Sequence, residues 1–301
     1  MKNTKPKVRL WSVLTGLTAI LTVAAIVGNI IANQYATTLN VALNASTYKI
    51  IKGETTGDTE YFKKGFASDE EREAYEAELC ATVEAEGAAL LKNENNALPL
   101  ASGAKVSLFG HGSVDLMYGG TGSGSVDTSK APNLKDALEA QGITINQTLW
   151  DLYKSDSMMS KYSRMTPASI SDTLEANTQY AVNEAPWSAL SSAESSFAEY
   201  GDAAIVVLSR SGGEGADLPS GANGTNDSWI SGQEGDGNYL ALSAEEIELL
   251  QNLKALKDNG TFKNIIVLIN SSNAIELDFL NPAICGEDYG IDAAMWIGDV
   301  G

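Results

Sequence analysis

One glutamate stands out in this sequence because of the segment that presents it. Residues 203–217 read AAIVVLSRSGGEGAD, so a short apolar run leads directly into a glycine-rich stretch that holds Glu214. A continuous run rich in β-branched residues predicts a strand covered on both faces in a parallel sheet. Functional groups of such sheets lie on loops beyond the carboxyl ends of the strands. This pattern predicts that the loop presents the Glu214 carboxylate at a functional edge, and an ordinary solvated turn is the alternative.

A second glycine-rich stretch, GGTGSGSVD at residues 119–127, follows a predicted strand KVSLF at 105–109. A dinucleotide fingerprint is excluded because Gly110 and Gly112 are followed by Asp115 where the third glycine is required. A phosphate-binding P-loop is excluded because the stretch lacks the Lys-Ser/Thr pair. These residues predict a polar loop able to approach a sugar, with a surface loop of no function as the alternative.

The scarcity of histidine and cysteine excludes several other chemistries. His111 is the only histidine, and it lacks the motifs of a Ser-His-Asp triad or a zinc protease, which predicts a structural or rim position for it. Cys80 and Cys285 have no metal-ligand spacing, and we expect two small buried side chains rather than a disulfide. The sequence predicts no metal and no cofactor.

Four motifs occur together in this chain and carry a family resemblance. In chain order they are LLKNENNALPL at 90–100, the glycine run at 119–127, SGGEGAD at 211–217 and SSNAIELDF at 271–279. Together they resemble the C-terminal α/β sandwich domain of family 3 glycoside hydrolases, the β-glucosidase and β-xylosidase family. The resemblance covers about residues 69–301.

The resemblance implies an activity and a set of site residues. The family places a nucleophilic Asp on a (β/α)8 barrel and an acid/base Glu on a sandwich loop, which implies that Glu214 is the general acid/base. Glu234, in the later stretch GQEGDGNYLALS, is its rival. The implied function is part of a retaining, exo-acting, β-glucosidase-like enzyme that hydrolyses terminal β-linked sugars from oligosaccharides or glycosides. The glycine run is implied to border the substrate pocket through Gly120, Gly122, Ser123, Gly124 and Ser125.

Composition narrows the partners. The chain has 20 Lys and Arg against 39 Asp and Glu, a net charge of −19, so nucleic acid is excluded as a partner by repulsion of its phosphates. A glycoside substrate and a barrel domain of the same parent chain are the expected partners. A non-catalytic carbohydrate-binding module and a structural surface domain stay open as alternatives.

The N-terminus predicts attachment to a membrane. Residues 10–32 form 23 positions without a charge, directly after a basic tip that contains four Lys and Arg. As a helix this segment spans roughly 34 Å, enough to cross the hydrocarbon core of a bilayer. No cleavage site is evident near residues 29–36, so we expect an uncleaved signal anchor, with a cleaved signal peptide and a buried helix as alternatives. The basic tip predicts an extracellular domain.

The remaining pattern predicts the fold class, a mostly parallel sheet covered by helices on both faces. A helix is expected at 69–91 with Leu79, Val83, Leu90 and Leu91 as its apolar face, and another from a Ser243 cap to Leu256. No barrel pattern precedes the sandwich, and no covering helix follows the last predicted strand, which suggests an incomplete domain from a member with reversed domain order. The expected divisions are a cytoplasmic tip at 1–9, an anchor at 10–32, a spacer at 33–68 and the sandwich at 69–301.

Overall fold

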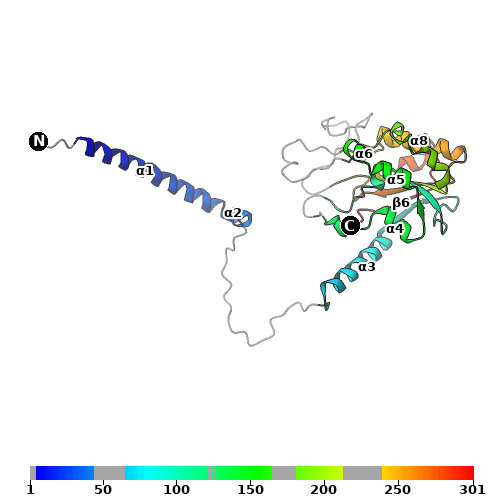
Figure 1. Cartoon of the computed structure of the whole chain (residues 1–301), viewed down its shortest axis with the longest axis horizontal. Coiled ribbons are helices and arrows are strands. Elements are labelled where there is room, and N and C mark those ends of the chain that lie inside the picture. Colours follow the sequence, from blue (N-terminus) through cyan, green and yellow to red (C-terminus); the bar gives the residue numbers. More distant parts are fainter. Residues whose placement is uncertain (1–4, 44–64, 121–123, 125, 165–180, 213–238) are drawn as a thin grey trace. The chain divides into compact units, whose positions relative to one another are not determined.

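The computed structural model describes residues 5–43, 65–120, 124, 126–164, 181–212 and 239–301 of the chain. It divides into two compact units, Met1–Gly65 and Phe66–Gly301 (Figure 1). The described residues of the first unit form two helices, and the second unit contains the sheet.

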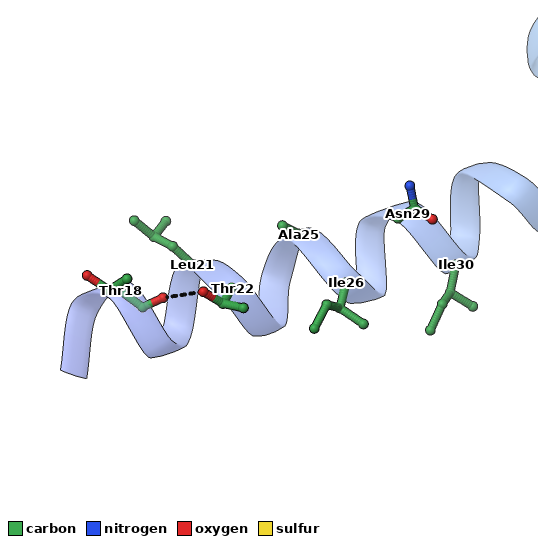
Figure 2. Close-up of a pocket in the computed structure, with 7 residues that line it drawn as sticks. All are labelled: Thr18, Leu21, Thr22, Ala25, Ile26, Asn29 and Ile30. Carbon is green, nitrogen blue, oxygen red and sulfur yellow. Dashed lines mark hydrogen bonds between the residues drawn. The ribbon is translucent and has the colours of Figure 1, made fainter. Parts of the chain in front are cut away.

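The first unit is dominated by one long apolar helix. Helix α1 (Lys5–Gln34) contains a span of 25 residues, Leu10–Gln34, with a mean hydropathy of 2.1, and the short helix α2 (Ala36–Ala42) follows it. The hydroxyl of Thr22 donates to the carbonyl of Thr18 at 2.9 Å (Figure 2), so this polar group is satisfied within the helix itself. The hollow drawn in Figure 2 is lined by residues of α1 alone and is not an enclosed cavity. Length and composition fit a signal sequence or a membrane anchor.

The second unit is built on a six-stranded sheet in the order β1-β6-β5-β4-β2-β3. All neighbouring strands are parallel except β1, which pairs antiparallel with β6. The mixed α/β fold with a mostly parallel sheet is therefore confirmed. The strands are β1 (Ala89–Asn93), β2 (Lys105–Phe109), β3 (Thr144–Ile145), β4 (Ala203–Ser209), β5 (Ile265–Asn270) and β6 (Ala293–Trp296).

Helices and 3-10 turns connect the strands. The α-helices are α3 (Asp69–Gly87), α4 (Leu134–Ala140), α5 (Gln147–Tyr153), α6 (Asp156–Lys161), α8 (Ala244–Asp258) and α9 (Pro282–Cys285). The 3-10 turns are η1 (His111–Ser113), η3 (Thr128–Lys130), η4 (Trp187–Leu190), η5 (Glu194–Tyr200) and η7 (Asp278–Leu280).

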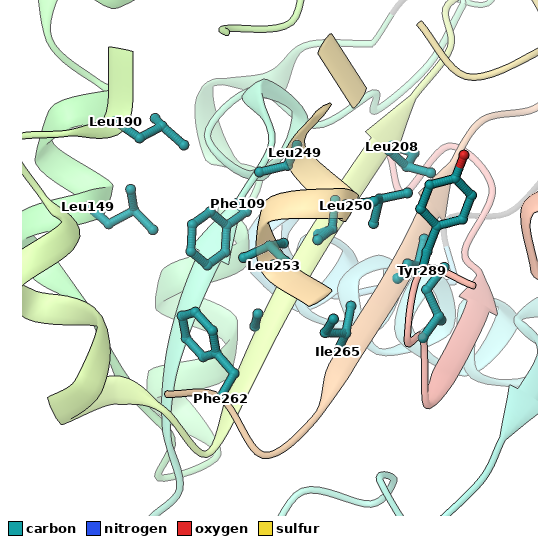
Figure 3. Close-up of a cluster of buried hydrophobic side chains, with 14 of the residues drawn as sticks. Phe109, Leu149, Leu190, Leu208, Leu249, Leu250, Leu253, Phe262, Ile265 and Tyr289 are labelled. Atoms are coloured by element: carbon teal, nitrogen blue, oxygen red, sulfur yellow. The ribbon is translucent and has the colours of Figure 1, made fainter. Parts of the chain in front are cut away.

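Strand β4 shows how the sheet builds a core on each face. All of its residues are buried, and their side chains alternate between the two faces. Val206 and Leu208 join a core that contains the inner side chains of α8, whereas Ile205 joins a second core against which α4 packs. Figure 3 shows the first core, in which α8 lies across the strands. Leu249, Leu250 and Leu253 of α8 are among the buried side chains of this core.

The start of α8 follows the sequence prediction. The Ser243 hydroxyl accepts from the Glu246 amide at 3.2 Å, and the Glu246 carboxylate accepts from the Ser243 amide at 2.8 Å, which completes a capping box. Both residues are buried, at 1% exposure each. This cap therefore lies inside the fold, next to the polar groups described below.

Helix α3 corrects the expected helix at 69–91. The helix ends at Gly87, and Leu90 and Leu91 belong to β1, where Leu90 lies opposite Met295 of β6. Backbone pairing with β6 outweighs the helical preference of the leucines. The expected apolar face is also wrong for the rest of the helix, because no side chain of α3 is buried and Leu79 is 47% exposed.

The burial of the two cysteines differs in part from the expectation that both side chains are buried. Both are free thiols, but Cys80 is exposed on α3 and Cys285 is only partly buried at the end of α9. The expectation is wrong for Cys80 for the same reason as for Leu79, since none of the described elements covers α3.

The α8 core should dominate the stability of the second unit. We expect Leu253→Ala to lower the free energy of unfolding by about 2–5 kcal/mol, because it opens a cavity at a fully buried position. Leu79→Ala removes the same atoms from an exposed site and serves as the control, with an expected change under about 0.5 kcal/mol. Urea unfolding of the whole chain in mild detergent, followed by tryptophan fluorescence, measures both; equal losses would contradict the assignment of the core.

Candidate functional site

Three of the sequence motifs emerge at one edge of the sheet. Strands β2, β4 and β5 are parallel neighbours, so the loops that follow Phe109, Ser209 and Asn270 leave the sheet from the same side. The chain moves from β2 outward to β3 and then returns to β4 on the other side of β2. Ligands of open α/β sheets bind at the carboxyl ends of the strands, where the strand order reverses in this way. Polar side chains at this carboxyl edge are therefore candidates for the functional site.

Asn270 joins three loops at this edge. Its side-chain amide donates to the carbonyls of Met117 at 3.0 Å and Gly298 at 2.7 Å. Its side-chain oxygen accepts from the Met117 amide at 2.5 Å and from the Ser209 hydroxyl at 3.1 Å. The residue is fully buried, and these four hydrogen bonds tie the end of β5 to the end of β4 and to the chain that follows β2 and β6.

Two glycines let these loops approach one another closely. A Cβ on Gly112 would collide with the hydroxyl of Ser209, and a Cβ on Gly212 would collide with the side-chain amide of Asn273. Gly212 belongs to the SGGEGAD motif, and Asn273 belongs to SSNAIELDF. The two motifs are thus in direct contact, and a side chain at position 212 would have to displace the Asn273 amide.

Arg210, the first residue after β4, is fully buried with all of its guanidinium protons in hydrogen bonds. Nε donates to the carbonyl of Tyr239 at 2.7 Å, and Nη2 donates to the carbonyl of Ala241 at 2.6 Å. Nη1 donates to the carbonyl of Ser209 at 3.0 Å. The remaining two protons form a bidentate pair with the Glu246 carboxylate at 2.8 and 2.7 Å. No sequence motif marks Arg210 or its pairing with Glu246.

A tyrosine hydroxyl joins the same two pieces of chain. The Ser211 amide donates to the Tyr239 hydroxyl at 2.9 Å, and this hydroxyl donates to the Ser211 carbonyl at 3.1 Å. Tyr239 is fully buried, and its ring centroid lies 5.7 Å from the guanidinium carbon of Arg210. Residues 210–211 and 239–241 are therefore held together from both sides.

His111 takes part in a second polar cluster at the carboxyl edge. Its Nε2 lies 3.4 Å from Oδ2 of Asp115, which is also 3.0 Å from Nη2 of Arg164. Burial opposes the charge of Asp115, but His111 and Arg164 outweigh it and lower the pKa of this carboxyl below its ordinary value. His111 is 3% exposed, which agrees with the structural position expected for it.

Glu184 is a buried carboxyl beside this cluster. Its two oxygens accept from the amides of His111 at 2.6 Å and Ala185 at 2.9 Å. Burial raises the pKa of Glu184 to about 7 despite these hydrogen bonds. It borders a cavity of about 10 Å³, shared with Arg164 and Ser209, which holds about one water molecule and not a sugar ring. Sequence analysis missed Glu184 because residues 181–185 (AVNEA) carry no motif.

Comparison with known proteins identifies the family. Residues 88–298 match the model of the glycosyl hydrolase family 3 C-terminal domain. This chain belongs to that family. It is 34% identical over 146 residues to beta-glucosidase A of Butyrivibrio fibrisolvens, a match that covers 46% of this chain and 15% of the relative. The chain thus spans a small part of the relative that it matches.

Solved structures show the same relationship. A β-glucosidase from Paenibacillus barengoltzii is similar with a TM-score of 0.54 at 26% identity, over 74% of this chain and 21% of that protein. β-Glucosidase 3B from Thermotoga neapolitana, in complex with glucose, has a TM-score of 0.53 at 22% identity, over 76% and 28% of the two chains. The second similarity concerns the fold alone.

The structure describes only some of the residues that the family resemblance singles out. Glu214, Glu234, Gly122, Ser123 and Ser125 lie outside the described residues. Gly120 and Gly124 are described, and a Cβ on neighbouring Gly119 would lie 2.6 Å from the Gly124 carbonyl, so Gly119 and Gly124 of this family 3 domain lie close together. Its start is anchored by Met117 on Asn270. The described residues contain no cluster of three or more His, Cys, Asp or Glu that could hold a metal ion.

The raised pKa of Glu184 predicts a pH-dependent stability. The ordinary pKa of 4.5 applies to the unfolded chain, and the folded value is about 7, so the folded state keeps a proton that the unfolded state releases between these values. The associated stability is complete below about pH 4.5 and falls by up to about 3 kcal/mol as the pH rises to about 7. We expect Glu184→Gln, which cannot titrate, to remove this fall.

Urea unfolding at about pH 5 and about pH 8 measures the difference. Glu194→Gln, at an exposed position of η5, is the matched control and should keep the pH dependence of the parent chain. An unchanged slope in Glu184→Gln would show that another group titrates in this range.

Proposed function

We propose that this chain supplies the acid/base loop and the pocket rim of a retaining, exo-acting β-glycosidase of the β-glucosidase type. Its substrates in this proposal are oligosaccharides or glycosides that end in a β-linked sugar. The family match over residues 88–298 carries the proposal, and the name of the Butyrivibrio relative, beta-glucosidase A, supports the substrate class. The meeting of three motifs at the carboxyl edge of the sheet supports a pocket at this edge.

Glu214 is the general acid/base in this proposal. A retaining glycosidase needs one carboxylate to attack the anomeric carbon and a second, about 5–5.5 Å away, to protonate the leaving oxygen and later to activate water. In the sequence, Glu214 follows Gly212 by two residues. Its rival Glu234 precedes Tyr239 by five residues.

The nucleophile is proposed to come from a (β/α)8 barrel that accompanies this domain in the complete enzyme. The chain covers 15% of the curated relative and 21% of the Paenibacillus enzyme, so most of such an enzyme lies beyond the matched part. Without the nucleophile, an acid alone cannot form the glycosyl-enzyme intermediate. In this proposal the chain by itself therefore leaves glycosides uncleaved.

Replacing Glu214 tests this assignment in a preparation that joins the chain to its barrel. Glu214→Ala should slow hydrolysis of cellobiose, which has a poor leaving group, by about 10²–10⁴-fold more than hydrolysis of an activated aryl β-glucoside. Azide attacks the glycosyl-enzyme without a general base, so it should restore turnover of the aryl substrate and yield a β-glycosyl azide. Both rates and the azide product are measured.

Glu234→Ala is the matched control, because it removes the same group from the rival position. It should show neither the leaving-group effect nor the rescue by azide. Rescue of Glu234→Ala alone would transfer the assignment to the later stretch. If neither substitution changes the rate of hydrolysis and the chain binds glycosides, a non-catalytic carbohydrate-binding domain is favoured.

We further propose that α1 is an uncleaved signal anchor with the sheet domain outside the cell. The span Leu10–Gln34 is long enough to cross a bilayer, and lysines before it favour a cytoplasmic N-terminus. Protease added to intact cells should digest the region after residue 44 and leave an N-terminal tag protected. In lysed cells the tag should be lost as well. A secreted domain whose N-terminus lies near residue 33 would show that the helix is a cleaved signal sequence.

A further inference from the structure

The two ends of segment 213–238 converge on one buried group. The chain enters this segment through Ser211 and Gly212 and leaves it at Tyr239. Arg210 donates to the carbonyls of Tyr239 and Ala241, and the Tyr239 hydroxyl exchanges hydrogen bonds with the backbone of Ser211. We call Arg210, Tyr239 and Glu246 the stem cluster, because it joins the two stems of the segment that contains Glu214.

The stem cluster admits one arrangement. A guanidinium has five N–H donors, and all five are used by three carbonyls and both oxygens of Glu246. Arg210 and Glu246 are 0% and 1% exposed, so water cannot replace a lost partner. A shift of either stem would leave a buried donor or carbonyl unpaired, which is strongly unfavourable.

Stability alone does not account for such a cluster. A buried ion pair often adds no net stability over well-packed apolar side chains, since desolvation of the charges offsets their attraction. What the pair does provide is a fixed geometry. It links three places: the end of β4, the returning stem at Tyr239 and Ala241, and the first turn of α8, where Glu246 also accepts from the Ser243 amide.

We propose that the stem cluster is a positioning device for Glu214, with the Tyr239 hydroxyl and Arg210 fixing the backbone from which this residue departs. The inference rests on the proposed function of Glu214. Only Ser211, Gly212 and one further residue separate Arg210 from Glu214, and Gly212 is pressed against Asn273. The backbone that the cluster fixes thus ends two residues before the proposed acid in the sequence, and catalysis is sensitive to misplacement of an acid by about 1 Å.

Tyr239→Phe tests the inference with the least disturbance. It keeps the ring beside Arg210 and the carbonyl that Nε binds, and it removes only the hydroxyl at Ser211. Hydrogen exchange of the whole chain, read by mass spectrometry on peptides that cover Ser211, should become at least about fivefold faster there. Arg210→Lys, which can satisfy at most three of the five acceptors, should have a larger effect but can fail to fold.

Asp292→Asn is the matched control for general destabilisation. Asp292 is a buried carboxylate at the opposite edge of the sheet, where it pairs with Lys257 at 2.6 Å and accepts from the Ile265 amide at 2.9 Å. This variant should speed exchange where β5 and β6 begin and leave the Ser211 peptides unchanged. Equal rates of exchange of the Ser211 peptides in Tyr239→Phe and in the parent chain would show that the stem cluster does not fix this backbone.

The catalytic arm separates this inference from the proposed function. In the preparation joined to its barrel, Tyr239→Phe should lower kcat/KM for cellobiose about tenfold and leave kcat/KM for the activated aryl glucoside within about twofold of the parent, because only the departure of the poor leaving group of cellobiose needs the acid. A loss of folded enzyme would lower both rates equally, and that result would overturn the positioning role.

Glu214→Ala is measured beside it. If azide rescues Glu214→Ala but Tyr239→Phe has parental dependence on the leaving group, the positioning inference is wrong and the proposed function stands. If azide does not rescue Glu214→Ala, the proposed role of Glu214 is wrong, and with it the positioning inference, whatever the exchange data show for the stems.

Discussion

The buried guanidinium of Arg210 is the constraint on which the carboxyl edge of this domain depends. A positive charge removed from water is tolerated only when every donor has a partner, and here the partners come from three separate parts of the chain. The requirement works in both directions. The strand, the returning stem and the helix must reach their places for Arg210 to be satisfied, and once satisfied Arg210 holds them there. Glu246 is well placed as the charged partner of Arg210, because the first turn of α8 favours its negative charge.

Asn270 extends the same principle with neutral groups. Its amide satisfies backbone groups of the loops after β2 and β6, which no strand partner reaches at the end of a parallel sheet. The apolar cores beneath supply the burial energy but say little about where loops go, since hydrophobic contacts are not directional. The polar side chains at the carboxyl edge supply that direction. The close packing of Gly212 on the Asn273 side chain further restricts how the loops after β4 and β5 can lie against each other.

Local patterns in the sequence predicted the parts of the fold that depend on local causes. The apolar run of β4 and the Ser243 capping box follow from neighbouring residues, and both are found as expected. Leu90 and Leu91 could not be placed in this way, because their strand forms only by pairing with β6, some 200 residues later. The sequence gives no local signal for this pairing.

The site shows the same division. The family motifs point to Glu214 and the glycine run, because those residues recur at a set spacing. Arg210 and Glu184 carry no such signal: their significance lies in complete burial and in partners distant in sequence. A hint was present for Arg210, since an arginine directly after a fully apolar strand must find several partners inside the fold. Nothing comparable marks Glu184, whose neighbours come from the loop after β2.

The antiparallel direction of β1 has a mechanical consequence. Because β1 runs against β6, its first residue, Ala89, lies opposite Trp296 at the carboxyl end of β6. The chain therefore enters the sheet from α3 at the edge where the motifs gather. The Trp296 indole donates to the Ser271 carbonyl at 2.7 Å, within the SSNAIELDF motif. A force transmitted along α3 therefore acts first on the β1–β6 pairing at Ala89 and Trp296. It is transmitted to the loops around the proposed pocket before it reaches the far edge of the sheet.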